Sequence, residues 1–263
     1  MKILFIGDAI GKPGRNVLKN VLPGIKDEFN VDLTILNGEN VAGGVGITRK
    51  VYEELLQLGI DVITSGNHIW DKREFINDIV KCEKLIRPAN YPPTVPGKDD
   101  IVIEVGGVKV GVLNFNGRVF MPCLDCPFRS ADQKILQLNK ENIKVIIVDF
   151  HAEATSEKVA MGWYLDGRIS AILGTHTHVQ TADERILPFG TAYISDVGMV
   201  GARDSVIGVQ SAPILERFLH QLPQKFEPEE NGPMIFNAII MHIDTESGKA
   251  IKIERINRVI EEK

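Results

Sequence analysis

Five short apolar runs in this chain are each followed at once by carboxylates, amides or imidazoles, and few folds accommodate that pattern. Each run reads as a buried strand. In open α/β sheets, ligands bind beyond the carboxyl ends of the strands, where loops from several strands meet. The runs, with the polar residues that follow them, are 2–6 (Asp8), 31–36 (Glu39, Asn40), 60–64 (Asn67, His68), 144–148 (His151) and 169–173 (His176, His178). We therefore expect these side chains to gather at one edge of a sheet.

The last run ends in the sequence GTHTH, which places His176 and His178 two residues apart. If the backbone stays extended there, alternate side chains share a face, so both imidazoles point the same way. Two neutral imidazoles that converge just past a buried strand suit a divalent metal. Taken alone, the pair also fits a polar loop with two ordinary surface histidines. The recurrence of polar groups at the other strand ends favours the metal.

Apolar periodicity predicts the elements that connect these strands. Helices are expected at residues 14–29, 48–58 and 70–81, and the resulting β-α-β-α-β alternation implies parallel strands joined by crossovers. We predict a short strand at 85–89 and a glycine-bearing loop at 196–208. The remaining predictions are hairpins at 101–115 and 234–255 and helices at 131–139, 156–165 and 212–219.

The polar strand ends extend from residue 8 to residue 178, so any division of the chain would also divide the site. We therefore expect one domain spanning residues 1–263 with an α/β core of mixed strands.

Composition excludes several classes of protein. The chain is 44% hydrophobic and 25% charged, as in ordinary globular proteins, and no apolar stretch is long enough to span a membrane. A net charge of −5 argues against a broad face for duplex DNA. Three cysteines without a secretory signal suit a reducing compartment. We therefore expect a cytoplasmic protein with no membrane partner.

The polar groups at the strand ends combine oxygen and nitrogen donors and lack thiolate. Such a set suits iron, manganese or zinc better than calcium. It is too large for one tetrahedral ion but fits two ions that share one carboxylate. Two divalent ions about 4 Å apart can hold a hydroxide between them and clamp the oxygens of an in-line phosphoryl displacement. The candidate ligands are Asp8, Glu39, Asn67, His151, His176 and His178.

The order of these motifs resembles the signature of the calcineurin-like metallophosphoesterases. A closer similarity, to the bacterial YmdB-like branch, covers nearly the whole chain and is carried by NGENVAGGVGIT, TSGNHIWDK, NFNGRVFM and SDVGMVGARDSVIG. Members of that branch are assigned 2',3'-cyclic-nucleotide phosphodiesterase activity. The resemblance implies a four-layer α/β/β/α sandwich of two mixed sheets, with both metals at the strand ends.

The resemblance also implies a role for each site residue. One metal would be held by Asp8, Glu39, Asn40 and His178, and the other by Glu39, Asn67, His151 and His176, with Glu39 bridging. His68 would be the general acid that protonates the leaving oxygen; the alternative is a group that only supports the ligands.

Two residues depart from the wider superfamily. Ile10 stands where a histidine is usual, and Glu39 stands where the bridging residue is usually aspartate. One metal site therefore lacks an imidazole. We expect iron, with manganese or zinc as the other choices.

The expected function is hydrolysis of 2',3'-cyclic nucleotides or related RNA-derived phosphodiesters, including RNA ends. The metal-bridging hydroxide would attack phosphorus in line, and the enzyme is expected to be a homo-oligomer. Two alternatives stay open: a regulatory nucleotide- or RNA-binding protein with low turnover, and a phosphomonoesterase. An intact His68 favours catalysis, because a pure binder needs no positioned acid. Arg118 and Arg203 lie in polar loops near the site, either as phosphate contacts or as solvated side chains.

Overall fold

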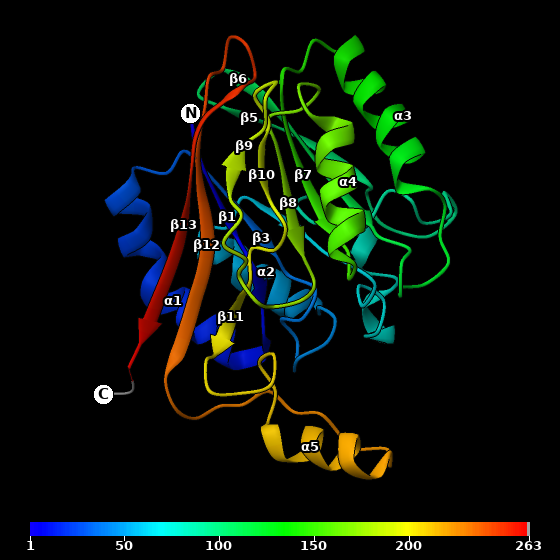
Figure 1. Cartoon of the computed structure of the whole chain (residues 1–263), viewed down its shortest axis with the longest axis vertical. Helices are drawn as coiled ribbons and strands as arrows, with labels where there is room; N and C mark the ends of the chain where they lie inside the picture. Colours follow the sequence, from blue (N-terminus) through cyan, green and yellow to red (C-terminus); the bar gives the residue numbers. More distant parts are fainter. Residues whose placement is uncertain (262–263) are drawn as a thin grey trace.

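The computed structural model describes residues 1–261, which form two mixed β-sheets packed face to face with helices on the outer faces (Figure 1). In spatial order, the first sheet comprises β2 (Asp8–Ala9), β11 (Met199–Ala202), β12 (Met234–Ile243), β1 (Lys2–Ile6), β3 (Leu33–Asn37) and β4 (Val62–Thr64), with β13 (Ala250–Ile260) paired to β12. The second comprises β5 (Asp100–Val105), β6 (Val108–Asn116), β7 (Val145–His151), β8 (Ala171–Thr175), β10 (Ala192–Ile194) and β9 (Arg185–Ile186).

Strand direction brings the polar strand ends together. In the first sheet β1, β3 and β4 are parallel, and in the second sheet β6, β7, β8 and β10 are parallel. The carboxyl ends of parallel strands lie at the same edge of their sheet, so the loops after them converge.

Three apolar layers separate the four structural layers. Alternation along β1 sends Ile3 and Phe5 to the core between the sheets and Leu4 and Ile6 to the opposite face. That opposite face packs against α1 (Gly11–Phe29) and α2 (Arg49–Gln57). The second sheet packs its outer face against α3 (Pro127–Lys140) and α4 (Thr155–Leu165). The expected four-layer α/β/β/α sandwich is thus confirmed.

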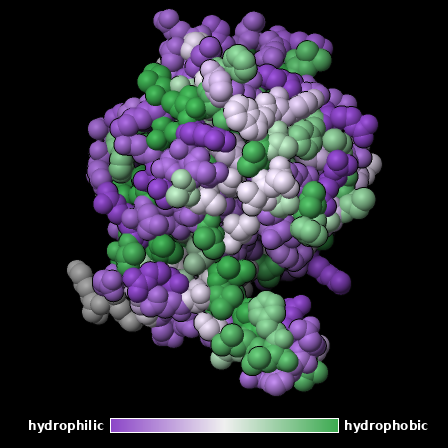
Figure 2. All heavy atoms as spheres, viewed as in Figure 1, coloured by the Kyte–Doolittle hydropathy of each residue, from purple (hydrophilic) through white to green (hydrophobic). Residues whose placement is uncertain are grey.

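One further helix, α5 (Ser211–His220), projects below the sandwich in Figure 1. Figure 2 shows apolar residues gathered over this projection, and Leu215, Phe218 and Leu219 on α5 are all exposed. Within residues 1–261, no helix combines the length and the apolarity needed to cross a bilayer.

Three of the secondary-structure elements predicted from the sequence were wrong. Instead of the expected helix at 70–81, the structure has two single 3-10 turns, Arg73–Phe75 and Ile79–Lys81. In this segment only the apolar side chains of Phe75 and Ile79 are well buried. Two such residues form too narrow an apolar stripe for a regular helix. The expected strand at 85–89 reduces to isolated bridges. The expected loop at 196–208 contains β11, a four-residue strand whose pattern is masked by Gly201 within it and Gly198 just before it.

Candidate metal centre

The polar residues expected at the strand ends do lie at the neighbouring ends of both sheets. Asp8 belongs to β2, Glu39 and Asn40 follow β3, and Asn67 and His68 follow β4. From the second sheet, His151 is the last residue of β7, while His176 and His178 follow β8. Half of them are buried: Asp8, Glu39, Asn40 and His151. Asn67, His176 and His178 are half-buried, and the His68 side chain is 40% exposed.

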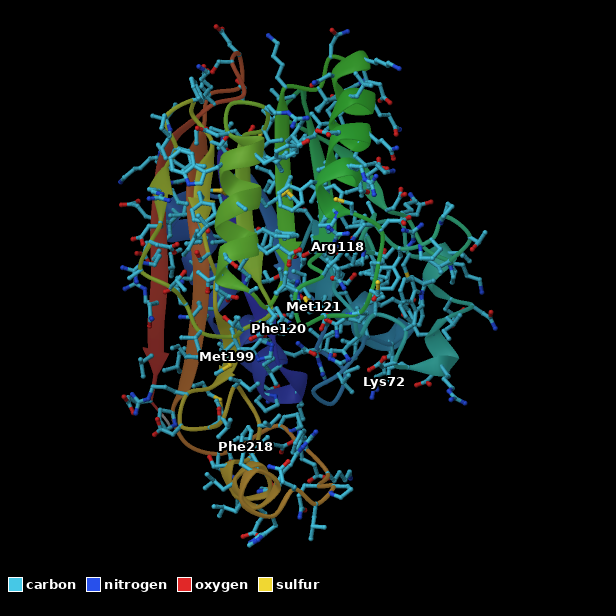
Figure 3. The ribbon with its side chains drawn as sticks, turned by 45° about the vertical axis from the view of Figure 1, so that its right-hand side comes forward. Lys72, Arg118, Phe120, Met121, Met199 and Phe218 are labelled. Carbon is cyan, nitrogen blue, oxygen red and sulfur yellow. The ribbon has the colours of Figure 1, made fainter. Side chains whose placement is uncertain are left out.

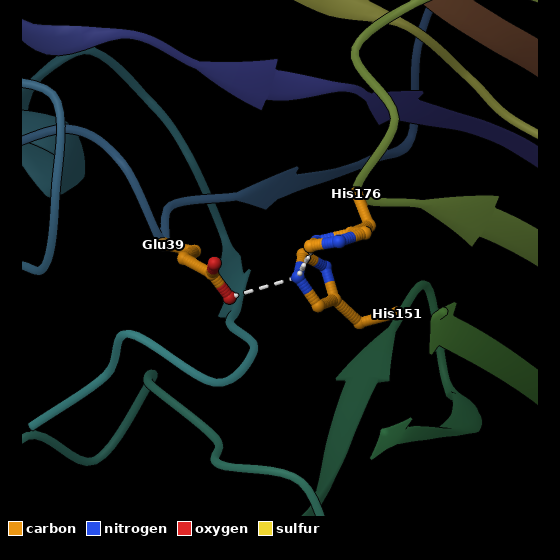
Figure 4. A group of neighbouring side chains, drawn as sticks. All are labelled: Glu39, His151 and His176. Carbon is orange, nitrogen blue, oxygen red and sulfur yellow. Dashed lines mark hydrogen bonds and ion pairs between the residues drawn. The ribbon is translucent and has the colours of Figure 1, made fainter. Parts of the chain in front are cut away.

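Three side chains converge most closely: Glu39, His151 and His176 (Figure 4). Each offers one ligand atom within 4.8 Å of the others. Nε2 of His151 lies 3.1 Å from Oε2 of Glu39 and 3.0 Å from Nδ1 of His176. One carboxylate from the first sheet and two imidazoles from the second sheet thus point at one place.

Both carboxylate oxygens of Glu39 are buried and accept no hydrogen bond from any described residue, and Oδ1 of Asn67 is in the same condition. Buried polar atoms without a partner are costly and rare in proteins. A divalent cation would satisfy such oxygens, so the donor set fits a metal ion. The neighbouring Gly66 leaves it room, since a Cβ there would lie 1.6 Å from Oε2 of Glu39.

A hydrogen-bond chain sets the tautomer of His151. The Thr175 hydroxyl donates to Oδ1 of Asp149 at 2.7 Å, so Thr175 Oγ1 can accept the Nδ1 proton of His151 at 2.9 Å. Nε2 then carries the lone pair and faces Glu39 and His176. A carboxylate that orients a ligating imidazole is common in metal sites.

A second group contains Asp8, Asn40 and His178. Nε2 of His178 lies 3.7 Å from Oδ1 of Asp8 and 3.2 Å from the amide nitrogen of Asn40. His178 donates from Nδ1 to the backbone oxygen of Ile207 at 2.8 Å, which leaves Nε2 as the acceptor. The amide of Asn40 also reaches Oδ1 of Asp8 at 3.5 Å.

The expectation of an extended backbone at the two histidines was wrong. His176 has φ of 102° and His178 has φ of 65°, both in a region that side chains other than glycine rarely adopt. The two imidazoles therefore separate: His176 joins Glu39 and His151, while His178 joins Asp8 and Asn40. Positive φ at functional positions stores strain that the surrounding structure must hold.

Burial disfavours charge on two carboxyl groups and three imidazoles of the site. It raises the pKa of Asp8 to about 7 and raises the pKa of Glu39. It lowers the pKa of His151 to about 4 and that of His176 to about 3, and it also lowers the pKa of His178. These three imidazoles are therefore neutral lone-pair donors at neutral pH, as metal coordination requires.

His68 stands beside the first group without joining it. Its Nδ1 lies 2.7 Å from Oδ2 of Asp71, and its Nε2 lies 3.9 Å from Oε1 of Glu39. Asp71 thus orients the ring so that Nε2 faces the cluster.

Several supporting residues escaped the sequence analysis: Asp149, Lys158, Asp196 and Glu153, whose carboxylate lies 3.2 Å from Nε2 of His176. Asp196 accepts from the backbone nitrogen of Thr177, between the two histidines, at 3.0 Å and from Lys158 at 2.7 Å. The available signal was the segment SDVGMVGARDSVIG, in which Asp196 is the second residue.

The two loop arginines have other contacts. The guanidinium of Arg118 lies 3.6 Å from Sγ of Cys126, and Arg203 pairs with Asp204 at 2.8 Å.

The site opens into a cavity of about 600 Å³. Its walls include Glu39, Asn40, His68, His176 and His178. A cavity of this size fits a small organic ligand of nucleotide dimensions.

Comparison with known proteins places the chain in a family. The family model described as "YmdB-like protein" matches residues 4–256. The chain belongs to the YmdB-like family. The resemblance inferred from the motifs is thereby confirmed.

Three relatives of this YmdB-like protein cover nearly all of it. A Bacillus subtilis (strain 168) protein named 2',3'-cyclic-nucleotide 2'-phosphodiesterase is 50% identical over 256 residues, 97% of this chain and 96% of its own length. A hypothetical protein from Thermus thermophilus has a crystal structure with a TM-score of 0.92 and 42% identity, over 99% and 100% of the two chains. A novel phosphatase from Mycoplasma pneumoniae has a TM-score of 0.93 and 36% identity, over 99% and 94%.

Proposed function

We propose that this protein is a metal-dependent phosphodiesterase that hydrolyses 2',3'-cyclic nucleotides. The observation that carries the proposal is the convergence of Glu39, His151 and His176 around unpartnered carboxylate oxygens in a nucleotide-sized cavity. The name of the 50% identical Bacillus subtilis relative supports the substrate class. The same proposal includes RNA-derived phosphodiester ends as further substrates. It also includes a cytoplasmic location, a single domain and a homo-oligomeric state.

Two transition-metal ions complete the proposed site, iron first, with manganese or zinc as alternatives. Glu39, Asn67, His151 and His176 would hold one ion, and Asp8, Glu39, Asn40 and His178 the other. Rotation of the Asn40 amide by half a turn would present its oxygen where its nitrogen now faces Asp8 and His178. When bound, two such ions supply a water of lowered pKa and neutralise phosphoryl charge.

The protein's own residues position the substrate and move one proton. Hydrolysis breaks the bond between phosphorus and the 2' oxygen, forms a bond from phosphorus to a water oxygen, and transfers one proton to the departing ribose oxygen. His68 would donate that proton from Nε2, because Nδ1 is engaged by Asp71 at 2.7 Å. The burial of Glu39 keeps its carboxylate out of bulk water and strengthens its electrostatic interactions.

The test compares wild-type protein with His68→Ala, after anaerobic purification and metal reconstitution, on 2',3'-cyclic AMP, adenosine 3'-monophosphate and an aryl phosphodiester. We expect the cyclic nucleotide to be hydrolysed with the highest kcat/KM. His68→Ala should keep its metal and lose roughly 10²–10⁴-fold in kcat on the cyclic nucleotide, with a smaller loss on the aryl ester, whose leaving group departs without a proton. Lys81→Ala is the control, because the Lys81 side chain is 68% exposed, pairs with Asp78 and does not line the cavity.

Each alternative predicts a different result. Faster hydrolysis of the monoester would favour a phosphomonoesterase, and tight binding without turnover would favour a regulatory protein. Loss of metal in His68→Ala would make His68 a ligand, and full activity would remove it from the mechanism.

A further inference from the structure

The cavity at the metal centre has two chemically different sides. One carries the polar residues described above. The other is apolar and comes largely from the segment that leaves and rejoins the sandwich around α5: Ile207, Val209, Ile214 and Phe226. A site that only had to hold metal and phosphate would have no use for this second side, which favours an apolar part of the ligand.

The base of this segment is fixed against the site. Val206 and Val209 exchange backbone hydrogen bonds. The backbone nitrogen of Gln210 donates to the backbone oxygen of Glu227, and that of Glu229 donates to the backbone oxygen of Gly208. Pro228 packs so closely on the site loop that a Cβ at Gly44 would lie 3.1 Å from it. The apolar side is therefore held in place relative to the polar side.

Ile207 connects the two sides directly. Its backbone oxygen accepts the Nδ1 proton of His178 at 2.8 Å, while its side chain lines the cavity and is 48% exposed. Its φ is 50°, a strained conformation for a β-branched residue. Strain of this kind concentrates where a side chain or backbone group has a functional placement.

Phe226 supplies the aromatic surface of the apolar side. It lines the cavity and is 38% exposed, and the Arg217 guanidinium of α5 lies 5.1 Å from its ring centroid. This cation–π contact restrains the ring. A restrained, partly exposed ring in a cavity is a stacking surface for a planar group.

We propose that the wall formed by Ile207, Val209, Ile214 and Phe226 binds the nucleobase of the substrate, with Phe226 stacking on it. The proposal rests on the proposed function, since it assigns the base of a nucleotide whose phosphate lies at the metal centre. An apolar stacking wall recognises any base through its π-face. It should therefore favour nucleotides over base-free phosphodiesters and purines over pyrimidines.

The experiment uses the metal-loaded full chain and a pair of substrates that differ only in the base: 2',3'-cyclic AMP and methyl β-ribofuranoside 2',3'-cyclic phosphate. The variants are Phe226→Ala, the conservative Phe226→Tyr and the control Phe218→Ala. Phe218 lies on α5, outside the cavity lining, and is 72% exposed (Figure 3). Binding of adenosine 3'-monophosphate and of methyl riboside 3-phosphate is measured in parallel by calorimetry.

Phe226→Ala should lower kcat/KM for the adenosine substrate roughly 5- to 100-fold, mainly through KM, the loss expected from one base–aromatic stack. The base-free substrate should be unaffected, Phe226→Tyr should restore the preference, and Phe218→Ala should match the wild type. Equal losses on both substrates, or no loss on the nucleotide, would overturn the proposal. If wild type hydrolyses neither substrate, the proposed function fails, and calorimetry decides the wall alone: base-dependent binding lost in Phe226→Ala supports it, and binding indifferent to the base refutes it.

Discussion

Glu39 presents two buried carboxylate oxygens that accept no hydrogen bond within residues 1–261, between imidazoles that burial keeps neutral. In the absence of a cation this arrangement is unfavourable, because the carboxylate has lost its water and gained no donor. A bound ion would remove that cost. The Glu39 carboxylate therefore raises metal affinity but lowers the stability of the metal-free protein.

Glu39→Gln should separate the two quantities. We expect the wild type to bind two transition-metal ions per chain and the variant to lose both sites, because the proposed bridging carboxylate belongs to each. The free energy of unfolding of the metal-free variant should exceed that of the metal-free wild type by about 1–3 kcal/mol, since a neutral amide costs less to bury than a carboxylate. Elemental analysis and urea denaturation in chelator measure the two effects.

Glu53→Gln is the matched control, because Glu53 is 52% exposed and pairs with the surface residue Arg49 at 2.6 Å. It should retain both ions. A Glu39→Gln variant that still holds two ions would refute the dinuclear assignment.

The sequence predicts which residues approach one another but not how they divide. Strand ends and donor chemistry indicate Asp8, Glu39, His151 and the two later histidines. The positive φ values of His176 and His178, which send their rings to different groups, depend on tertiary contacts such as the bond from His178 to Ile207. Spacing alone carries no such information.

Among the elements, α4 and the loop after β10 meet through a buried ion pair. Lys158 and Asp196 are 3% and 2% exposed and lie 2.7 Å apart. Asp196 also accepts from the backbone nitrogens of Thr177 and Gly198. This carboxylate therefore fixes the loop that carries His176 and His178, and Lys158 neutralises its charge.

Lys158→Met should lower the free energy of unfolding by about 3–5 kcal/mol, because it leaves a buried carboxylate without its cation. Adding Asp196→Asn should recover part of the loss, since the charge is removed while one acceptor remains. The control is Lys252→Met in the surface pair with Glu254, also 2.7 Å apart but 53% and 42% exposed, which should cost at most about 1 kcal/mol. Equal costs for the two lysine variants in urea denaturation would show that the buried pair is not structurally important.

Sequence patterns predicted the long elements better than the short ones. The continuous apolar runs of β1 and β7 and the apolar periodicity of α1 and α3 reflect burial along many residues, so they are visible in the sequence. The four-residue β11 is a strand because it pairs with β2 and β12. Its own sequence contains little information about that pairing. The apolar wall at Phe226 was missed for a related reason: it becomes a site only because Pro228 docks on the loop at Gly44.

At the scale of the whole molecule, the candidate ligands come from both sheets. Asp8 and Glu39 belong to the first sheet or its loops, whereas His151, His176 and His178 belong to the second. An ion held by both groups would join the sheets at the end where their loops converge, in addition to the apolar core between them. Metal binding should therefore stabilise the chain as one unit.

We expect thermal unfolding of the metal-free protein to show a single transition, and added Mn²⁺ to move that whole transition upward. Ligand that binds only the folded state at about 100 times its dissociation constant contributes roughly 2.7 kcal/mol per site. Hydrogen exchange followed by mass spectrometry should show increased protection in β1 and β3 as well as in β7 and β8, because opening either sheet releases the ion. Glu39→Gln should lack this response, which separates the site from nonspecific cation effects. Two transitions, of which Mn²⁺ shifts only one, would instead show that the sheets unfold independently and that residues 1–263 are not one domain.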